Sequence, residues 1–125
     1  MEPTDHVEIV QLLARYCHIV DAAAWDRLGE IFTADGSMTV TGIHDTHRGL
    51  DALRELYGVK MRHPLAHHST SVVVLDGDGA RARTVSKWIT VRSGGQAGTG
   101  VYEDDLVHTA DGWRIARRVA TPGGR

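Results

Sequence analysis

Residues 67–91 read HHSTSVVVLDGDGARARTVSKWITV, in which two alternating stretches are separated by the turn sequence Asp76-Gly77-Asp78-Gly79. Alternation with a period of two is typical of a β-strand with one buried face, and Gly and Asp favour the turn of a β-hairpin. The stretch therefore predicts two antiparallel strands, residues 69–75 and 80–91. It also marks the place, from His67 onward, where the preceding helical period ends.

The alternating pattern continues to the end of the chain. Residues 98–109 and 113–120 predict two further strands, separated by Asp111-Gly112. The glycines at 94, 95, 98 and 100 resemble a phosphate-binding loop, but Glu103 occupies the position of its last glycine and the segment lies between two strands, so a hairpin loop is expected. The sequence thus predicts four consecutive antiparallel strands.

The part before His67 has a helical period. A helix that opens on a capping-box pattern at Asp5 and Glu8 carries an apolar stripe of Ile9, Leu12, Leu13, Tyr16, Cys17 and Val20. A shorter helix is expected over residues 25–32, ended by residues 33–36, then a strand at 38–41 and a third helix over 50–61 that Pro64 stops. Helices followed by a meander predict an α+β fold, with helices on one face of a strongly bent sheet.

Length and charge limit the function classes. A chain of 125 residues with 42% hydrophobic residues and a formal charge of -2 predicts one domain over residues 1–125 and argues against nucleic-acid binding. The late arginines 114, 117, 118 and 125 are expected on a solvated strand face. Cys17 is the only cysteine, which excludes an intrachain disulfide and fits a reducing cytoplasm. Neither a signal peptide nor a membrane span is expected.

Asp21 is the first candidate functional residue. A spacing of four from Cys17 places it on the buried face of the first helix, where a carboxylate needs a partner or a purpose. One interpretation is a general base tuned by burial and by a nearby imidazole. The other is an ordinary Asp at a helix boundary that reaches solvent.

His67 and His68 are the candidate imidazoles. Adjacent strand residues point to opposite faces, so only one of them can face a pocket beneath the sheet, and alternation leaves open which one, or whether both form a surface pair. The alternative is a metal site built from His63, His67 and His68, or from His44 and His47. Its spacing does not match known ligand motifs, so no metal and no cofactor is expected.

The later strands carry further polar candidates. Tyr102, Asp104 and His108 alternate onto one face, where they are candidates to orient a carbonyl or enolate oxygen. Trp113 is expected in the core. Cys17 is expected to be a small buried residue and not a nucleophile.

The chain resembles the SnoaL-like polyketide cyclase branch of the nuclear transport factor 2-like superfamily, which also contains scytalone dehydratase and hexachlorocyclohexane dehydrochlorinase. The resemblance spans nearly the whole chain. It rests on the order of these segments: Arg15-Tyr16, residues 21–28 (DAAAWDRL), residues 31–36 (IFTADG), Gly49 before a Leu-rich helix, His67 before an apolar strand, residues 76–80 (DGDGA), residues 100–104 (GVYED) and residues 112–115 (GWRI).

The resemblance implies a cone in which about three N-terminal helices pack on a strongly curved, mixed but mainly antiparallel sheet around one cavity, commonly in a homodimer. It also implies that Asp21 and His67 act together in catalysis, which decides between His67 and His68. Tyr16, Trp25, Met38, Trp88 and Tyr102 would then shape the cavity. The second catalytic histidine of scytalone dehydratase falls near Thr90 and its pocket asparagine near Tyr102, so that specific activity is not implied.

Two function classes follow. The leading hypothesis is a cofactor-independent enzyme of dehydratase, isomerase or cyclase type that removes a proton from a small hydrophobic carbonyl-type molecule, with His67 as the base and Asp21 fixing its tautomer. The alternative is a non-catalytic module of the same fold that binds a small ligand or another protein.

Overall fold

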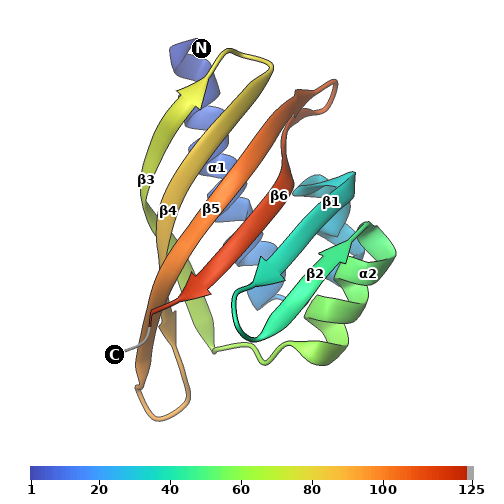
Figure 1. Ribbon diagram of the computed structural model, residues 1–125. Helices are drawn as coiled ribbons and strands as arrows, with labels where there is room; N and C mark the ends of the chain where they lie inside the picture. Colours follow the sequence, from blue (N-terminus) through green and yellow to red (C-terminus); the bar gives the residue numbers. More distant parts are fainter. Residues whose placement is uncertain (124–125) are drawn as a thin grey trace.

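Six strands form one mixed sheet in the order β2-β1-β6-β5-β4-β3, and helices cover one of its faces (Figure 1). The computed structural model describes residues 1–123. The strands are β1 (Phe32–Val40), β2 (His44–Arg48), β3 (Ala66–Gly77), β4 (Arg81–Val91), β5 (Ala97–Thr109) and β6 (Gly112–Pro122). The predicted α+β class is confirmed. The sheet curves around the helices without closing, so β2 and β3 are its two edges.

The predicted meander is confirmed, since β3, β4, β5 and β6 pair antiparallel in chain order. β3, β5 and β6 are longer than the alternating stretches suggested, whereas β4 begins one residue later than expected. The β4–β5 register runs without a shift from the Arg81 and Val107 pair to the Val91 and Ala97 pair. This long ribbon forms the wall of the molecule.

The first strand corrects the sequence prediction. The expected helix over residues 25–32 is a short 3₁₀ helix, η1 (Trp25–Glu30), and Phe32 already belongs to β1. Residues 33–36, expected to end the helix, lie in an irregular part of β1 whose register shifts between Phe32 and Ser37. β1 pairs parallel with β6 and antiparallel with β2, a strand that the sequence analysis did not predict. Turn-forming residues inside a strand with a bulge explain the error.

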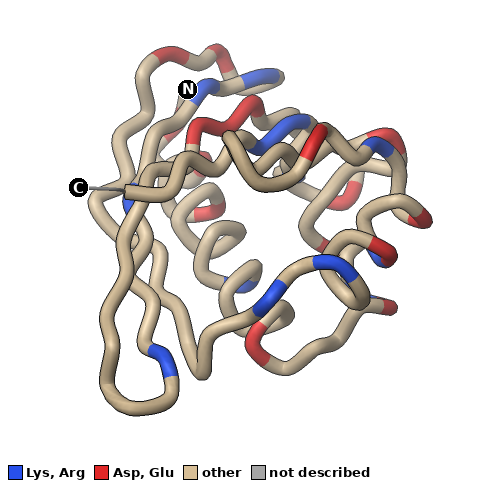
Figure 2. Tube along the Cα trace, turned by 60° about the horizontal axis from the view of Figure 1, so that its bottom comes forward, with Lys and Arg blue, Asp and Glu red and all other residues tan. Residues whose placement is uncertain are grey.

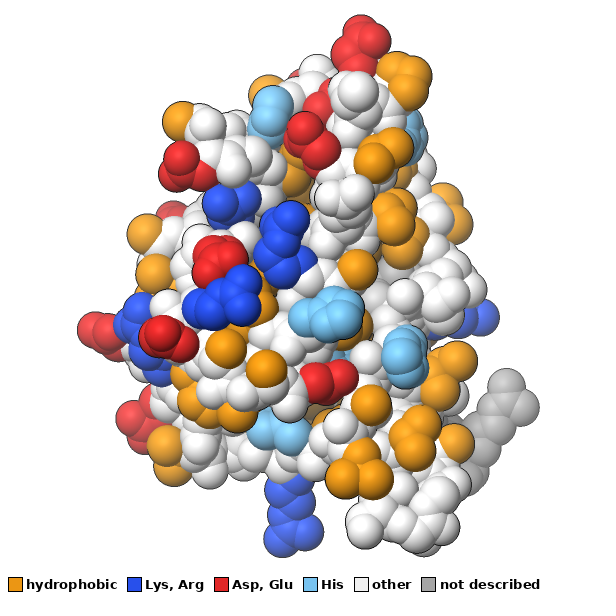
Figure 3. Space-filling model, turned by 180° about the vertical axis from the view of Figure 1, so that it is seen from behind, with side chains coloured by type: hydrophobic (Ala, Val, Ile, Leu, Met, Phe, Trp, Pro, Cys, Tyr) orange, Lys and Arg blue, Asp and Glu red, His pale blue; other side chains and the backbone are white. Residues whose placement is uncertain are grey.

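Helix α1 (Pro3–Asp21) packs on the inner face of the sheet against β3 and β6. The whole predicted apolar stripe is buried, together with Ile19. The helix begins three residues earlier than expected, because Glu2 and Asp5 form the capping box in place of Asp5 and Glu8. Seen from behind, the helical side of the molecule presents mixed acidic, basic, histidine and apolar side chains (Figure 3). Within residues 1–123, no helix combines the length and apolar character that a bilayer span requires.

The third predicted helix is present in two parts. Helix α2 (Leu50–Glu55) continues directly into a π-helical turn, η2 (Leu56–Lys60), and the chain then runs without regular structure to β3. Leu53, Leu56 and Tyr57 point into the core. A π turn commonly marks a functional site, because it displaces side chains from the regular helical positions.

Strand β3 has two register shifts against β4, and the extra residue at the first of them reverses its inward face. Its register with β4 shifts between Thr70 and Val73, and Ser71 adopts a positive φ of 53°. His67 faces inward before this bulge, whereas Val73 faces outward after it. Strict alternation from His67 would place Val73 on the same face, and the bulge is the reason why the two residues face opposite sides.

Candidate active site

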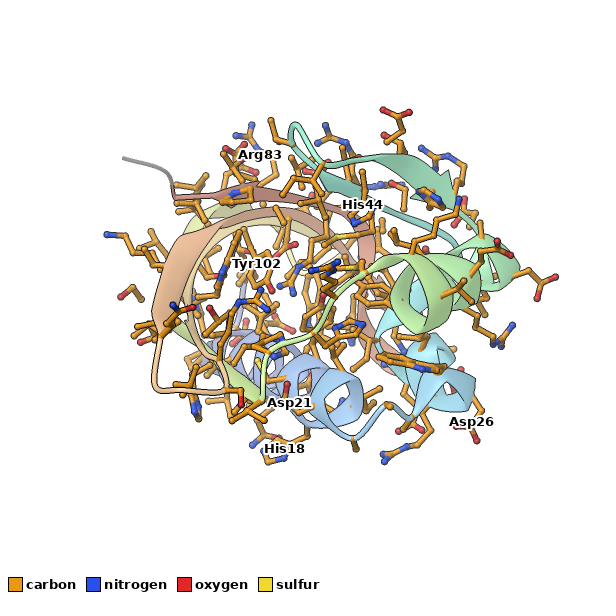
Figure 4. All side chains as sticks on the ribbon, turned by 90° about the horizontal axis from the view of Figure 1, so that it is seen from below. His18, Asp21, Asp26, His44, Arg83 and Tyr102 are labelled. Atoms are coloured by element: carbon orange, nitrogen blue, oxygen red, sulfur yellow. The ribbon has the colours of Figure 1, made fainter. Side chains whose placement is uncertain are left out.

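A cavity of about 530 Å³ lies between the inner face of the sheet, the end of α1 and the segment after η2. Its lining includes residues of the segment after η2 and of the β4–β5 hairpin, two segments that lie at the lower end of the molecule in Figure 1. The view from that end shows Asp21 at the near end of α1 and Tyr102 on the inner side of the sheet, while Asp26 and Arg83 lie on the outer surface (Figure 4). The deep part of the cavity is lined by Tyr16, Met38, Tyr57, Trp88 and Tyr102.

Asp21 and His67 are joined by two hydrogen bonds. The Nδ1 atom of His67 lies 2.7 Å from Oδ1 of Asp21, and the backbone N–H of His67 donates to Oδ2 at 3.2 Å. The two residues are brought together because α1 ends at Asp21, beside the start of β3. A carboxylate accepts hydrogen bonds only, so Nδ1 carries the proton and the lone pair of a neutral ring is on Nε2.

His67 is the buried member of the pair, with 5% of its side chain exposed. Burial lowers the pKa of His67 below its ordinary value of 6.5, and the Asp21 carboxylate raises it back only in part. The imidazole is therefore neutral at pH 7. His67 lines the cavity, and among the described residues its Nε2 atom has no hydrogen-bond partner.

The expectation that Asp21 is buried is wrong. Its side chain keeps 26% of its surface exposed, and it does not line the cavity but lies behind His67. The physical reason is its position as the last residue of α1, at the open end where the chain turns through Ala22 and Ala23. The alternative interpretation, an Asp at a helix boundary that reaches solvent, is therefore correct about its exposure, although the carboxylate also forms a hydrogen bond with the imidazole.

Three tyrosines face one another at the bottom of the cavity. The hydroxyl oxygens of Tyr16 and Tyr57 lie 2.7 Å apart, and the rings of Tyr16 and Tyr102 meet edge to face with centroids 5.9 Å apart. Burial raises the pKa of Tyr16, so its hydroxyl stays protonated near neutral pH. The Tyr16–Tyr57 bond uses one of two hydroxyl protons, which leaves the other for an oxygen atom of a ligand.

Arg118 lies fully buried behind these rings, contrary to the prediction of a solvated face. Its guanidinium carbon lies 3.7 Å from the ring centroid of Tyr102 and 4.2 Å from that of Tyr16. The carboxylate of Asp104 accepts two hydrogen bonds from it, at 2.7 and 2.9 Å. A register shift opposite Asp105 and Leu106 inserts an extra residue into β6 and turns Arg118 inward. Alternation alone had no signal for this shift.

The expected polar group on β5 is therefore divided. Tyr102 lines the cavity, Asp104 is occupied by Arg118, and His108 lies on the surface against Trp113, with ring centroids 5.0 Å apart. Trp113 is buried, as expected, and its Nε1 donates to Asp5 at 3.0 Å. Asp104 thus supports the tyrosine rings through Arg118 and does not itself reach the cavity.

Trp25 is a second correction. Tyr16, Met38, Trp88 and Tyr102 line the cavity, but Trp25 lies behind it, stacked on Tyr57 and tilted against His63 with centroids 6.0 and 5.1 Å away. His63, whose Nε2 lies 2.6 Å from the Tyr57 carbonyl oxygen, takes its place in the wall. Tyr57 was not predicted as a lining residue, because its position on the apolar stripe of a helix indicated only a residue of the hydrophobic core.

The structure does not assemble the alternative metal-ligand sets. His63 and His67 have the partners given above, and Nδ1 of His47 lies 2.7 Å from its neighbouring Asp45 carbonyl oxygen. Within residues 1–123, three possible ligand atoms meet only at Asp5, Glu8 and His108, away from the cavity. Asp5 there already accepts the Trp113 hydrogen bond.

The model of the SnoaL-like domain family matches residues 1–119. The uncharacterized protein Rv2910c of Mycobacterium tuberculosis is 32% identical over 127 residues, covering 96% of this chain and 86% of its own. An NTF2-like protein with a cystatin-like fold from Novosphingobium aromaticivorans is 25% identical, with a TM-score of 0.83 over 95% of this chain and 82% of that chain.

A hexachlorocyclohexane dehydrochlorinase, LinA-type3 from Novosphingobium barchaimii, has the same fold. Its TM-score is 0.80 over 97% of this chain and 88% of that chain, at 16% identity. At this identity the likeness concerns the fold alone.

Proposed function

The chain belongs to the SnoaL-like domain family, and from this membership and the site geometry we propose that it is a proton-transfer enzyme with His67 as the general base. The observation that carries the proposal is the 2.7 Å bond between Nδ1 of His67 and Asp21, which leaves the free Nε2 atom on the cavity wall. The substrate is a small, largely apolar molecule with an acidic C–H bond. The reaction is of dehydratase, isomerase or cyclase type.

Nε2 of His67 takes the proton from carbon. The imidazolium that forms is stabilised by the Asp21 carboxylate, which already accepts its Nδ1–H. The negative charge left on the substrate collects on an oxygen or on a leaving group. A hydroxyl of the Tyr16–Tyr57 pair, or that of Tyr102, donates to that atom, and the positive charge of Arg118 behind the rings favours this.

Two observations support this chemistry. The LinA-type3 protein that shares the fold is a dehydrochlorinase, and loss of hydrogen chloride begins with removal of a proton from carbon. The apolar deep wall also excludes water, which strengthens electrostatic interactions within the cavity.

The partial exposure of Asp21 favours a second candidate, a ligand-binding module in which the Asp21–His67 pair is structural. This candidate predicts a cavity that binds apolar molecules and returns them unchanged. A reaction that requires only a base in an apolar cavity distinguishes the two functions.

The probe is 5-nitrobenzisoxazole, a small aromatic compound whose N–O bond breaks to give a coloured nitrophenolate when a base removes its ring C–H proton. We expect purified protein to accelerate this reaction, and we expect His67→Gln to lower the rate by about a hundredfold or more. Asp26→Asn is the control, because Asp26 lies on the outer surface. Equal rates for the His67→Gln variant and the unmodified protein would leave the binding module as the function.

A further inference from the structure

Basic side chains surround the mouth of the cavity. Lys60, Arg62 and Arg92 all line it, and among the described residues of the lining none is Asp or Glu. Lys60 and Arg62 come from the segment after α2, whereas Arg92 comes from the β4–β5 hairpin. Figure 2 shows basic positions on both segments. Among the described residues that line the cavity, these three basic side chains therefore have no acidic side chain beside them.

Several basic residues elsewhere on the surface have acidic partners. Arg27 pairs with Glu30 at 2.8 Å and Arg54 pairs with Asp51 at 2.9 Å. Among the described residues, neither Arg62 nor Arg92 forms such a pair, and Nζ of Lys60 lies 3.0 Å from Nε2 of His47. The charges at the mouth are therefore free to meet an anion from solution.

The interior of the cavity, in contrast to its mouth, is mainly apolar. Met38, Trp88 and Val40 present apolar surface there, and its polar groups are tyrosine hydroxyls and the neutral His67. A ligand that satisfies both regions has an apolar body and a negative charge at one end. The charged end stays at the mouth, because burying an unpaired carboxylate in an apolar interior is costly.

We propose that the substrate is a hydrophobic anion whose carboxylate or similar acidic group binds between Lys60, Arg62 and Arg92 while its apolar body enters the cavity toward His67. The proposal rests on the proposed function only in placing the ligand in the same cavity. The basic mouth fixes which end of the molecule enters, and it attracts anions from solution in spite of the formal net charge of -2.

The test compares two ligands of nearly equal shape, 2-naphthoate and its neutral amide 2-naphthamide, by isothermal titration calorimetry at low and at high salt. We expect the unmodified protein to bind the anion about tenfold more tightly at low salt, as several partly screened attractions would give. The preference should shrink at high salt, where the Debye length falls to about 3 Å at 1 M.

The double variant Arg62→Gln/Arg92→Gln should bind the two ligands with nearly equal affinity. Arg83→Gln is the matched control, since Arg83 lies on the outer face, where 62% of its side chain is exposed. It should keep the full preference. An anion preference that is absent in the unmodified protein, or that survives in the double variant, overturns the basic mouth as the anion site.

A third variant separates this inference from the proposed catalytic function. His67→Gln removes the base, so it tests the two independently: the anion preference should persist in it, whether or not the variant has lost turnover of 5-nitrobenzisoxazole. Loss of the preference in His67→Gln would place the anion at the imidazole and overturn the inference. Loss of turnover with the preference intact supports both.

Discussion

Among the described residues, the carboxylate of Asp21 forms hydrogen bonds with a single residue, His67, through both the imidazole Nδ1 atom at 2.7 Å and the backbone N–H at 3.2 Å. The second bond fixes the position of the carboxylate relative to β3, and the first then fixes the ring. Orientation and tautomer of His67 therefore both depend on the last residue of α1.

Replacement of Asp21 by Asn should remove the preference for the Nδ1–H tautomer and the charge that stabilises imidazolium. We expect the turnover of 5-nitrobenzisoxazole to fall by about 10² to 10⁴. The thermal midpoint should change little, since the Asp21 side chain is partly exposed. Two-dimensional NMR of the ring nitrogens would show the tautomer change. An Asp21→Asn variant that keeps both tautomer and rate would contradict the role of the carboxylate.

The rate should depend on pH through His67. Because burial lowers the pKa of His67 below 6.5, the inactive imidazolium is populated only at lower pH. The rate should rise as the pH rises through the lowered pKa and should reach its plateau at a lower pH than with an ordinary imidazole. Asp21 raises this pKa in part, so Asp21→Asn should move the residual midpoint to still lower pH. A midpoint above the ordinary imidazole value in the unmodified protein contradicts this.

The buried pair of Asp104 and Arg118 should be costly to break. Asp104→Asn leaves a fully buried guanidinium without its counter-charge and should lower the free energy of unfolding by about 3–5 kcal/mol in urea titrations. The neighbouring pair of Asp105 and Arg117 supplies the comparison, because its side chains are 47% and 57% exposed. Asp105→Asn should cost less than about 1 kcal/mol. Similar costs for both substitutions would mean that the buried pair has no special role.

Gly100 allows Trp88 to lie flat across β5. A Cβ atom at Gly100 would overlap the six-membered part of the indole ring, so Gly100→Ala should displace Trp88 within the cavity. We expect a cost of about 1–3 kcal/mol in unfolding free energy and a change in tryptophan fluorescence. Gly29→Ala is the control, since its added Cβ would meet Leu50 at an ordinary 3.6 Å. Unchanged fluorescence in Gly100→Ala would show that the ring does not move.

Periodicity was sufficient for the elements with regular geometry. The stripe of α1 and the alternation after His67 predicted the helix, the meander and the α+β class, because burial on one face imposes those periods. The features it missed are local departures from a regular period: the 3₁₀ helix η1, the bulges in β3 and β6, and the π turn η2.

The candidate site also contains residues that could be predicted from the sequence and residues that could not. The spacing from Cys17 pointed to Asp21, whereas alternation left His67 and His68 open and the family resemblance selected His67. The structure brings Asp21 and His67 into hydrogen-bonding distance. Arg118 was assigned to the wrong face, because strict alternation from Trp113 and Ile115 turns Arg118 outward. The basic mouth was missed for another reason: Arg62 and Arg92 are 30 positions apart, and only the fold brings their segments to one opening.

The extra residue at Ser71 makes the two halves of β3 independent of one another. Deletion of one residue there would turn Val73 and its neighbours to the opposite face of the sheet and would leave His67 in place. Insertion of one residue before His67 would instead turn His67 outward and His68 toward the cavity. A gap misplaced by one position, when this strand is aligned with that of a relative, therefore exchanges the candidate base for a surface residue. Alignments across the family are safest when they start from β4, whose partners on β5 follow without interruption.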